Sequence, residues 1–110
     1  MTEVKFRMVK GDRKPSIQAT LTWKDGSAVD LTNCTAKFHM KKGDTVKVNK
    51  DASIVDPPTD GIVQYDWEDG DTDVDGVWLG EFEITFADGT TCTWPTDADL
   101  KIIFRKPYDT

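Results

Sequence analysis

Apolar and polar residues alternate along most of this 110-residue sequence, and Gly, Asp and Pro interrupt the alternation at short intervals. A period of two places successive side chains on opposite faces of a β-strand, so one face can be buried while the other meets solvent. The segment 34–41 is the clearest case, with apolar positions at Cys34, Ala36, Phe38 and Met40. The long apolar stripes typical of amphipathic helices are missing. The pattern therefore predicts an all-β protein.

Further strands are predicted wherever the alternation returns: at 3–8, 17–23, 45–48, 61–67, 76–86, 90–94 and 100–104. The segments 24–26 and 87–89 read "KDG" and "ADG", which are turn signals. Seven or eight short antiparallel strands in a chain of this length predict one domain over residues 1–110, a β-sandwich of two packed sheets. A small closed barrel is the structural alternative.

The charge balance limits the kinds of partner. The formal net charge is −6, whereas a surface that binds nucleic acid needs clustered Lys and Arg. No apolar run reaches the roughly 18 residues of a membrane span, and the first twelve residues lack the apolar centre of a secretory signal. We expect a soluble protein, made in the cytoplasm, that binds neither nucleic acid nor membrane.

The two cysteines, Cys34 and Cys92, raise the question of an intersheet disulfide. Antibody-type domains carry Tyr two residues before the second cysteine, and Thr90 stands there in this chain. A protein made in a reducing compartment is expected to keep both as free, buried thiols. The single histidine, His39, lies an odd number of residues from Cys34, so the two side chains should face opposite ways. No catalytic residue and no cofactor site is predicted.

The segment 71–76 resembles a calcium loop, because Asp71, Asp73, Asp75 and Gly76 form a D-x-D-x-D-G pattern. Such a loop needs a bidentate Glu at its twelfth position and flanking helices. Phe82 occupies that position, and a strand pattern follows. These three aspartates are therefore weak metal candidates, and the favoured interpretation is a solvated acidic connection between strands.

The four tryptophans could serve the core or a binding surface. Trp23, Trp67 and Trp78 fall on the apolar side of their strands, which favours packing in the core. Trp94 precedes Pro95 at a strand end and is predicted to be partly exposed, where it could anchor a partner.

Short motifs spread over residues 15–104 resemble the immunoglobulin-like N-terminal domain of phage baseplate upper proteins. The first half carries a Pro-led strand, a D-G turn, "DLT" and an F-x-M strand, at Pro15, Gly26, Asp30, Leu31, Thr32, Phe38 and Met40. The second half carries G-x-V-x-Y-x-W, D-T, G-x-W-x-x-E-F, D-G and a late Pro, at Gly61, Val63, Tyr65, Trp67, Asp71, Thr72, Gly76, Trp78, Glu81, Phe82, Asp88, Gly89 and Pro95.

This resemblance implies an immunoglobulin-like sandwich and a non-enzymatic structural role in a phage tail or baseplate. The implied partners are other virion proteins, in a multi-copy assembly. In the family this domain precedes a longer stem, whereas this chain stops at Thr110, so we expect a module that works by docking. A carbohydrate- or cell-surface-binding module, with Trp94 and Trp78 as a stacking platform, is the alternative hypothesis.

Overall fold

The protein is described by a computed structural model that covers residues 3–96 and 98–109. Its elements are the strands β1 (Glu3–Val9), β2 (Ile17–Thr20), β3 (Thr35–Lys42), β4 (Thr45–Ile54), β5 (Ile62–Tyr65), β6 (Gly76–Thr85), β7 (Thr91–Trp94) and β8 (Asp99–Arg105), with one short 3₁₀ helix, η1 (Pro58–Asp60). Among the described residues, no helix is long and apolar enough to cross a membrane.

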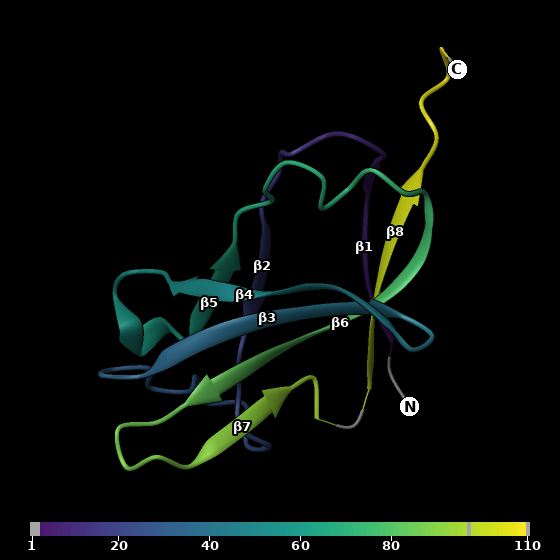
Figure 1. Cartoon of the computed structure of the whole chain (residues 1–110). Helices are drawn as coiled ribbons and strands as arrows, with labels where there is room; N and C mark the ends of the chain where they lie inside the picture. The colour runs from purple at the N-terminus through teal and green to yellow at the C-terminus, as the bar shows by residue number, and fades with distance from the viewer. Residues whose placement is uncertain (1–2, 97, 110) are drawn as a thin grey trace.

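The strands form a folded sheet in the order β1-β8-β6-β3-β4-β5-β2, with β7 added beside β6. Two strands change partner along their length. The first half of β6 pairs with β8 and its second half with β7, whereas β4 pairs first with β3 and then, at Ser53 and Ile54, with β5. The change at β4 carries the chain into a second layer of β5 and β2, and Figure 1 shows the β3–β4 hairpin crossing in front of β2. The molecule is therefore a β-sandwich, as the alternation predicted.

Two details differ from the sequence-based expectation. Strand β4 runs for ten residues instead of the four predicted, because its second half, "KDASI", carries mixed polar and small residues whose alternation is weak. Among the strands of residues 3–96 and 98–109, all neighbours are antiparallel except β1 and β8, which are parallel. Parallel pairing needs a long connection, and here nearly the whole chain separates the two strands, so no local signal could reveal it.

The predicted apolar faces do meet in one core. Its centre is a cluster of aromatic rings, in which Phe38 lies 4.8 Å from Tyr65, 5.0 Å from Phe82 and 5.7 Å from Trp67 between ring centroids. Phe38 and Phe82 are fully buried, and Trp67 and Tyr65 are 2% exposed. Phe38 lies on β3, Phe82 on β6 and Tyr65 on β5, and Trp67 follows two residues after β5. The cluster therefore joins the two layers.

The prediction that Trp23 packs in the core is wrong, since 47% of its surface is exposed. Strand β2 ends at Thr20, and the chain enters a turn closed by an isolated bridge between Thr22 and Ala28. Leu21 still points inward, but Trp23 lies beyond the sheet and stacks on Phe86 with 6.4 Å between ring centroids. The alternation continued in sequence after the strand itself had ended.

Three loops share one hydrogen-bonding arrangement, in which the side chain of an aspartate accepts from the residue two positions later. In Asp25-Gly-Ser, Asp30-Leu-Thr and Asp88-Gly-Thr, the aspartate Oδ1 accepts hydrogen bonds from the backbone N–H and the hydroxyl of the third residue. These bonds favour the charged carboxylate and lower the pKa of each aspartate. Aspartate therefore fixes these turns by local chemistry.

Gly61 lies directly before β5 and packs closely against the segment that follows β2, where the Leu21 N–H donates to the Gly61 carbonyl at 2.7 Å. Its φ is +71°, and an added Cβ would lie 2.8 Å from the carbonyl oxygen of Leu21 and 2.9 Å from that of Val29. We expect Gly61→Ala to lower the free energy of unfolding by about 1–3 kcal/mol through backbone strain, with the clash adding to that loss. Gly43→Ala is the matched control, because Gly43 has φ +58° but open space around its Cα. Urea denaturation of both variants measures the clash as their difference, and equal losses would contradict it.

Candidate docking surface and acidic connection

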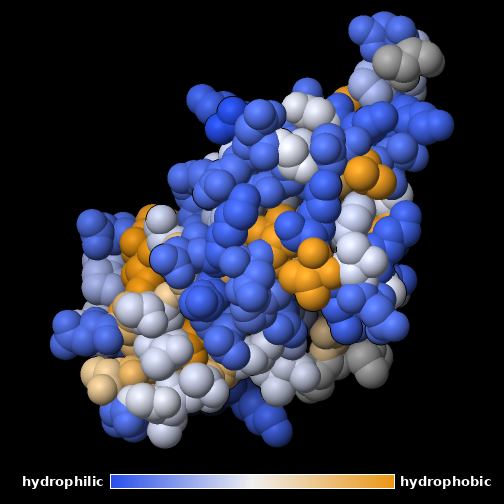
Figure 2. Space-filling view, viewed as in Figure 1, coloured by the Kyte–Doolittle hydropathy of each residue, from blue (hydrophilic) through white to orange (hydrophobic). Residues whose placement is uncertain are grey.

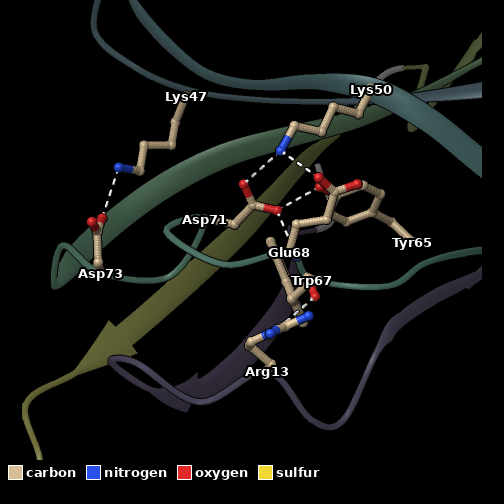
Figure 3. A network of polar contacts seen from close by, with 8 residues as sticks. All are labelled: Arg13, Lys47, Lys50, Tyr65, Trp67, Glu68, Asp71 and Asp73. Carbon is tan, nitrogen blue, oxygen red and sulfur yellow. Dashed lines mark hydrogen bonds and ion pairs between the residues drawn. The ribbon is translucent and has the colours of Figure 1, made fainter.

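The acidic connection between β5 and β6 is anchored in the protein by Asp71. The Asp71 side chain is almost fully buried, and its Oδ2 accepts hydrogen bonds from the Tyr65 hydroxyl at 2.5 Å and the Glu68 backbone N–H at 2.9 Å. Lys50 on β4 donates to the other oxygen at 3.2 Å and to Glu68 at 3.0 Å. Figure 3 shows these groups converging on Asp71.

The network also shifts proton affinities. Burial, followed by the hydrogen bond to Asp71, raises the pKa of Tyr65 well above its usual range. Hydrogen bonds to Glu68 and Asp71 raise the pKa of Lys50. Tyr65 therefore stays a hydroxyl donor and Lys50 stays charged at neutral pH. Through these hydrogen bonds the buried Asp71 carboxylate joins β4, β5 and the acidic connection.

The interpretation of the connection as merely solvated is therefore wrong for Asp71, while Asp73 does face solvent. Asp73 turns away from Asp71 and pairs with Lys47 at 2.7 Å, a contact that lowers the pKa of Asp73 (Figure 3). Asp75 is half-buried. In residues 3–96 and 98–109, no group of three or more His, Cys, Asp or Glu side chains is arranged to hold a metal ion.

Because the Asp71 oxygens are already engaged by Tyr65, Glu68 and Lys50, we expect calcium to have no effect on stability. The thermal midpoint should be the same in millimolar calcium and in excess chelator, with magnesium as the control for ionic strength. A ligand that binds only the folded state raises the midpoint as its concentration rises. A saturable increase with calcium alone would contradict this prediction.

Hydrogen bonds made by Thr72 and by Arg13 also attach this connection to the loop between β1 and β2. Thr72 is buried, its hydroxyl donates to the Asp12 carbonyl at 2.8 Å, and its own carbonyl accepts from Gly11 N–H at 2.8 Å. Arg13 Nε donates to the Trp67 carbonyl at 3.2 Å. Both residues of the D-T motif, Asp71 and Thr72, therefore hold the acidic connection in place through hydrogen bonds.

A groove borders Trp94, on the open side of the sandwich between β7 and the turn after β2. We call it the Trp94 groove; its volume is about 550 Å³, and its walls include Leu21, Trp23, Phe86, Cys92 and Trp94. Trp94 is half-buried, as the sequence predicted for a partly exposed residue. Most of the described residues that line it are apolar, and Lys24 is the one charged residue among them.

The structure separates Trp78 from this surface. Trp78 is 4% exposed, its indole N–H donates to the Val74 carbonyl at 3.3 Å, and Lys42 Nζ lies 5.6 Å from the ring centroid. The proposed sugar-stacking platform of Trp94 and Trp78 is therefore not formed. Trp23 also lies in the Trp94 groove, although the alternation predicted it in the core; its position directly before "KDG" was the signal that it belongs to a turn.

A second hollow of about 460 Å³ lies at the fork where β6 passes from β8 to β7. There His39 Nδ1 and Glu81 Oε2 are 2.9 Å apart, on neighbouring strands. Cys92 lines the Trp94 groove and not this hollow. Both cysteines are free, as predicted, but each is half-buried rather than buried. Burial and the charges of Asp30 and Asp88 raise the pKa of Cys34, which disfavours a reactive thiolate.

The exposed face in Figure 2 is mostly hydrophilic, with separate hydrophobic patches. Val46 on β4, and Val77 and Leu79 on β6, are exposed apolar residues of the sheet. Three strands, β1, β2 and β7, pair with only one neighbour within the described residues. Exposed edges and an apolar groove are features of a protein that binds other proteins.

Comparison with known protein families shows which family this chain belongs to. The family described as the BppU N-terminal domain matches residues 2–93. The chain belongs to this family of baseplate upper protein N-terminal domains. The resemblance inferred from the short motifs is thereby confirmed. Membership supports a structural protein of the phage baseplate that interacts with other virion proteins, and it favours a structural over a catalytic role.

Among solved structures, the chain is similar to CopC from Methylosinus trichosporium OB3b. The TM-score is 0.55 at 10% sequence identity, and the alignment covers 94% of this chain and 85% of that one. At this identity the likeness shows the fold alone, which is the immunoglobulin-like sandwich predicted from sequence. No curated protein sequence matches the chain.

Proposed function

We propose that this protein is a non-enzymatic docking module of a phage baseplate, present in several copies, that binds neighbouring virion proteins through strand edges and the loops beside them. It is made in the host cytoplasm and incorporated into the tail during assembly, without binding nucleic acid or membrane. The observation that carries the proposal is the family match over residues 2–93.

The fold supports docking in two physical ways. An edge strand offers backbone N–H and C=O groups that another chain can pair with, and the part of the chain that the structure describes has three such strands. Its net charge of −6 also favours encounter with a basic surface on a partner. Both features promote binding without requiring a catalytic group.

The proposal is tested first on the virion itself. Mass spectrometry of purified particles of the source phage should detect the chain, and antibody labelling in electron microscopy should place it at the baseplate. Each baseplate protein, purified separately, should then be tested for binding. A chain absent from the particle that also binds none of these proteins would overturn the proposal.

A further inference from the structure

The Trp94 groove lies directly beside the free edge of β7. Side chains of Cys92 and Trp94 line the groove, and Leu21 and Trp23 line it from the other layer. Strand β7 pairs with β6, and no other described strand lies on its second edge. The sandwich is therefore open between β7 and the turn after β2.

The register of β6 and β7 shows which backbone groups point out of this edge. Phe86 N–H donates to the Thr90 carbonyl at 2.8 Å, which makes this opposed pair hydrogen-bonded. Hydrogen-bonded and non-hydrogen-bonded pairs alternate in an antiparallel ladder. The pairs Thr85–Thr91 and Glu83–Thr93 are then non-hydrogen-bonded, so Thr91 and Thr93 direct their N–H and C=O groups away from β6. The Thr93 carbonyl already accepts from the Thr96 hydroxyl at 3.0 Å.

An added strand would use both features at once. It would pair with the outward groups of Thr91 and Thr93, and alternate side chains would then project into the groove between Trp94 and Trp23. Those side chains must be uncharged, because the described residues that line the groove are mostly apolar and Lys24 is the one charged residue among them. The rest of the chain is acidic, so charge complementarity favours Lys or Arg on either side of the inserted segment.

We infer that the β7 edge and the Trp94 groove form a β-augmentation site for an extended segment of a neighbouring baseplate protein, with apolar residues at alternate positions and basic residues flanking them. This inference rests on the proposed docking function and names the surface and the partner chemistry. The segment extends the β6–β7 side of the sheet by one strand and closes the open side of the sandwich.

The test measures the affinity of each purified baseplate protein for the wild-type chain and two variants. Thr93→Pro removes an outward N–H while leaving the β6–β7 hydrogen bonds, and Trp23→Ser removes an exposed groove wall. Both should weaken binding at least tenfold. Val46→Ser is the control, because Val46 is 59% exposed on β4, outside the groove. The thermal unfolding midpoint of every variant should be measured as well, to check that each variant is folded.

A second measurement uses the Cys92 thiol as a probe inside the groove. In a Cys34→Ser background, Cys92 becomes the single thiol, and its rate of maleimide labelling should fall at least tenfold when the partner is bound. Unlike substitution, this readout does not depend on the stability of a groove variant. The same complex should show slowed hydrogen exchange at the Thr91 and Thr93 amides.

The outcomes separate this inference from the proposed function. Binding by wild type that survives both groove substitutions and leaves Cys92 labelling unchanged would overturn the groove site and leave the docking function standing. Wild type that binds no baseplate protein would overturn both. Loss of binding in Val46→Ser, with normal binding in Thr93→Pro and Trp23→Ser, would move the interface to the outer face of the sheet and also refute the groove.

Discussion

Replacing Phe38 by Ala is expected to lower the free energy of unfolding by about 3–5 kcal/mol, the usual cost of removing a buried Phe side chain. Phe38 is fully buried on β3, and its ring contacts Tyr65, Trp67 and Phe82. The cavity would open where the two layers meet, and close packing on every side leaves little room to collapse. Since a domain of this kind is stable by only about 5–15 kcal/mol, this loss should be visible as a large fall in the urea midpoint.

Two controls show that the effect belongs to the cluster. Phe38→Leu retains most of the volume and should lose clearly less than Phe38→Ala. Val77→Ala removes an apolar side chain from the exposed face of β6 and should leave the midpoint nearly unchanged. If Phe38→Ala were as stable as Val77→Ala, the aromatic cluster would not be the centre of the core.

Replacing Asp71 by Ala is expected to lower stability by about 2–3 kcal/mol, because it strands the buried donors that the carboxylate satisfies. The Tyr65 hydroxyl and the Glu68 N–H both lose their acceptor. Lys50 loses less, since 38% of its side chain is exposed and water can replace the contact. The connection between β5 and β6 should also exchange its amide hydrogens faster.

The matched control is Asp73→Ala, two residues along the same connection. Asp73 pairs with Lys47 and is 59% exposed, so we expect no measurable change in the urea midpoint. The double variant Asp71→Ala, Tyr65→Phe also removes the Tyr65 hydroxyl, which Asp71→Ala alone leaves without an acceptor. It should therefore recover part of the stability that Asp71→Ala loses. Equal effects of Asp71→Ala and Asp73→Ala would contradict a structural role for the buried carboxylate.

The strands and most of the core could be predicted from sequence because alternation is a local property. Phe38 and Met40, Val63 and Tyr65, and Phe82 all lie inside, as their parity indicated. The D-G turns were equally predictable, since the aspartate and its hydrogen-bonded partner are two residues apart. The family resemblance rested on these same turn and core positions.

Other features depend on residues that are far apart along the chain. Asp71 looks like its neighbours Asp73 and Asp75 in sequence, and only the approach of Tyr65 and Lys50 makes it a buried anchor. Trp23 fits the alternation of β2 yet is exposed, because the strand ends before it.

What the sequence determined by itself is the class of fold: alternation sets which face of each strand is apolar, and aspartate and glycine set where the chain turns. The tertiary structure alone decided the parallel pairing of β1 with β8, the change of partner along β4 and β6, and hence the open edge at β7 beside the Trp94 groove. The physical reason is that strand pairing joins backbone groups, which are the same in every residue, so side-chain pattern selects a face but does not name the neighbouring strand.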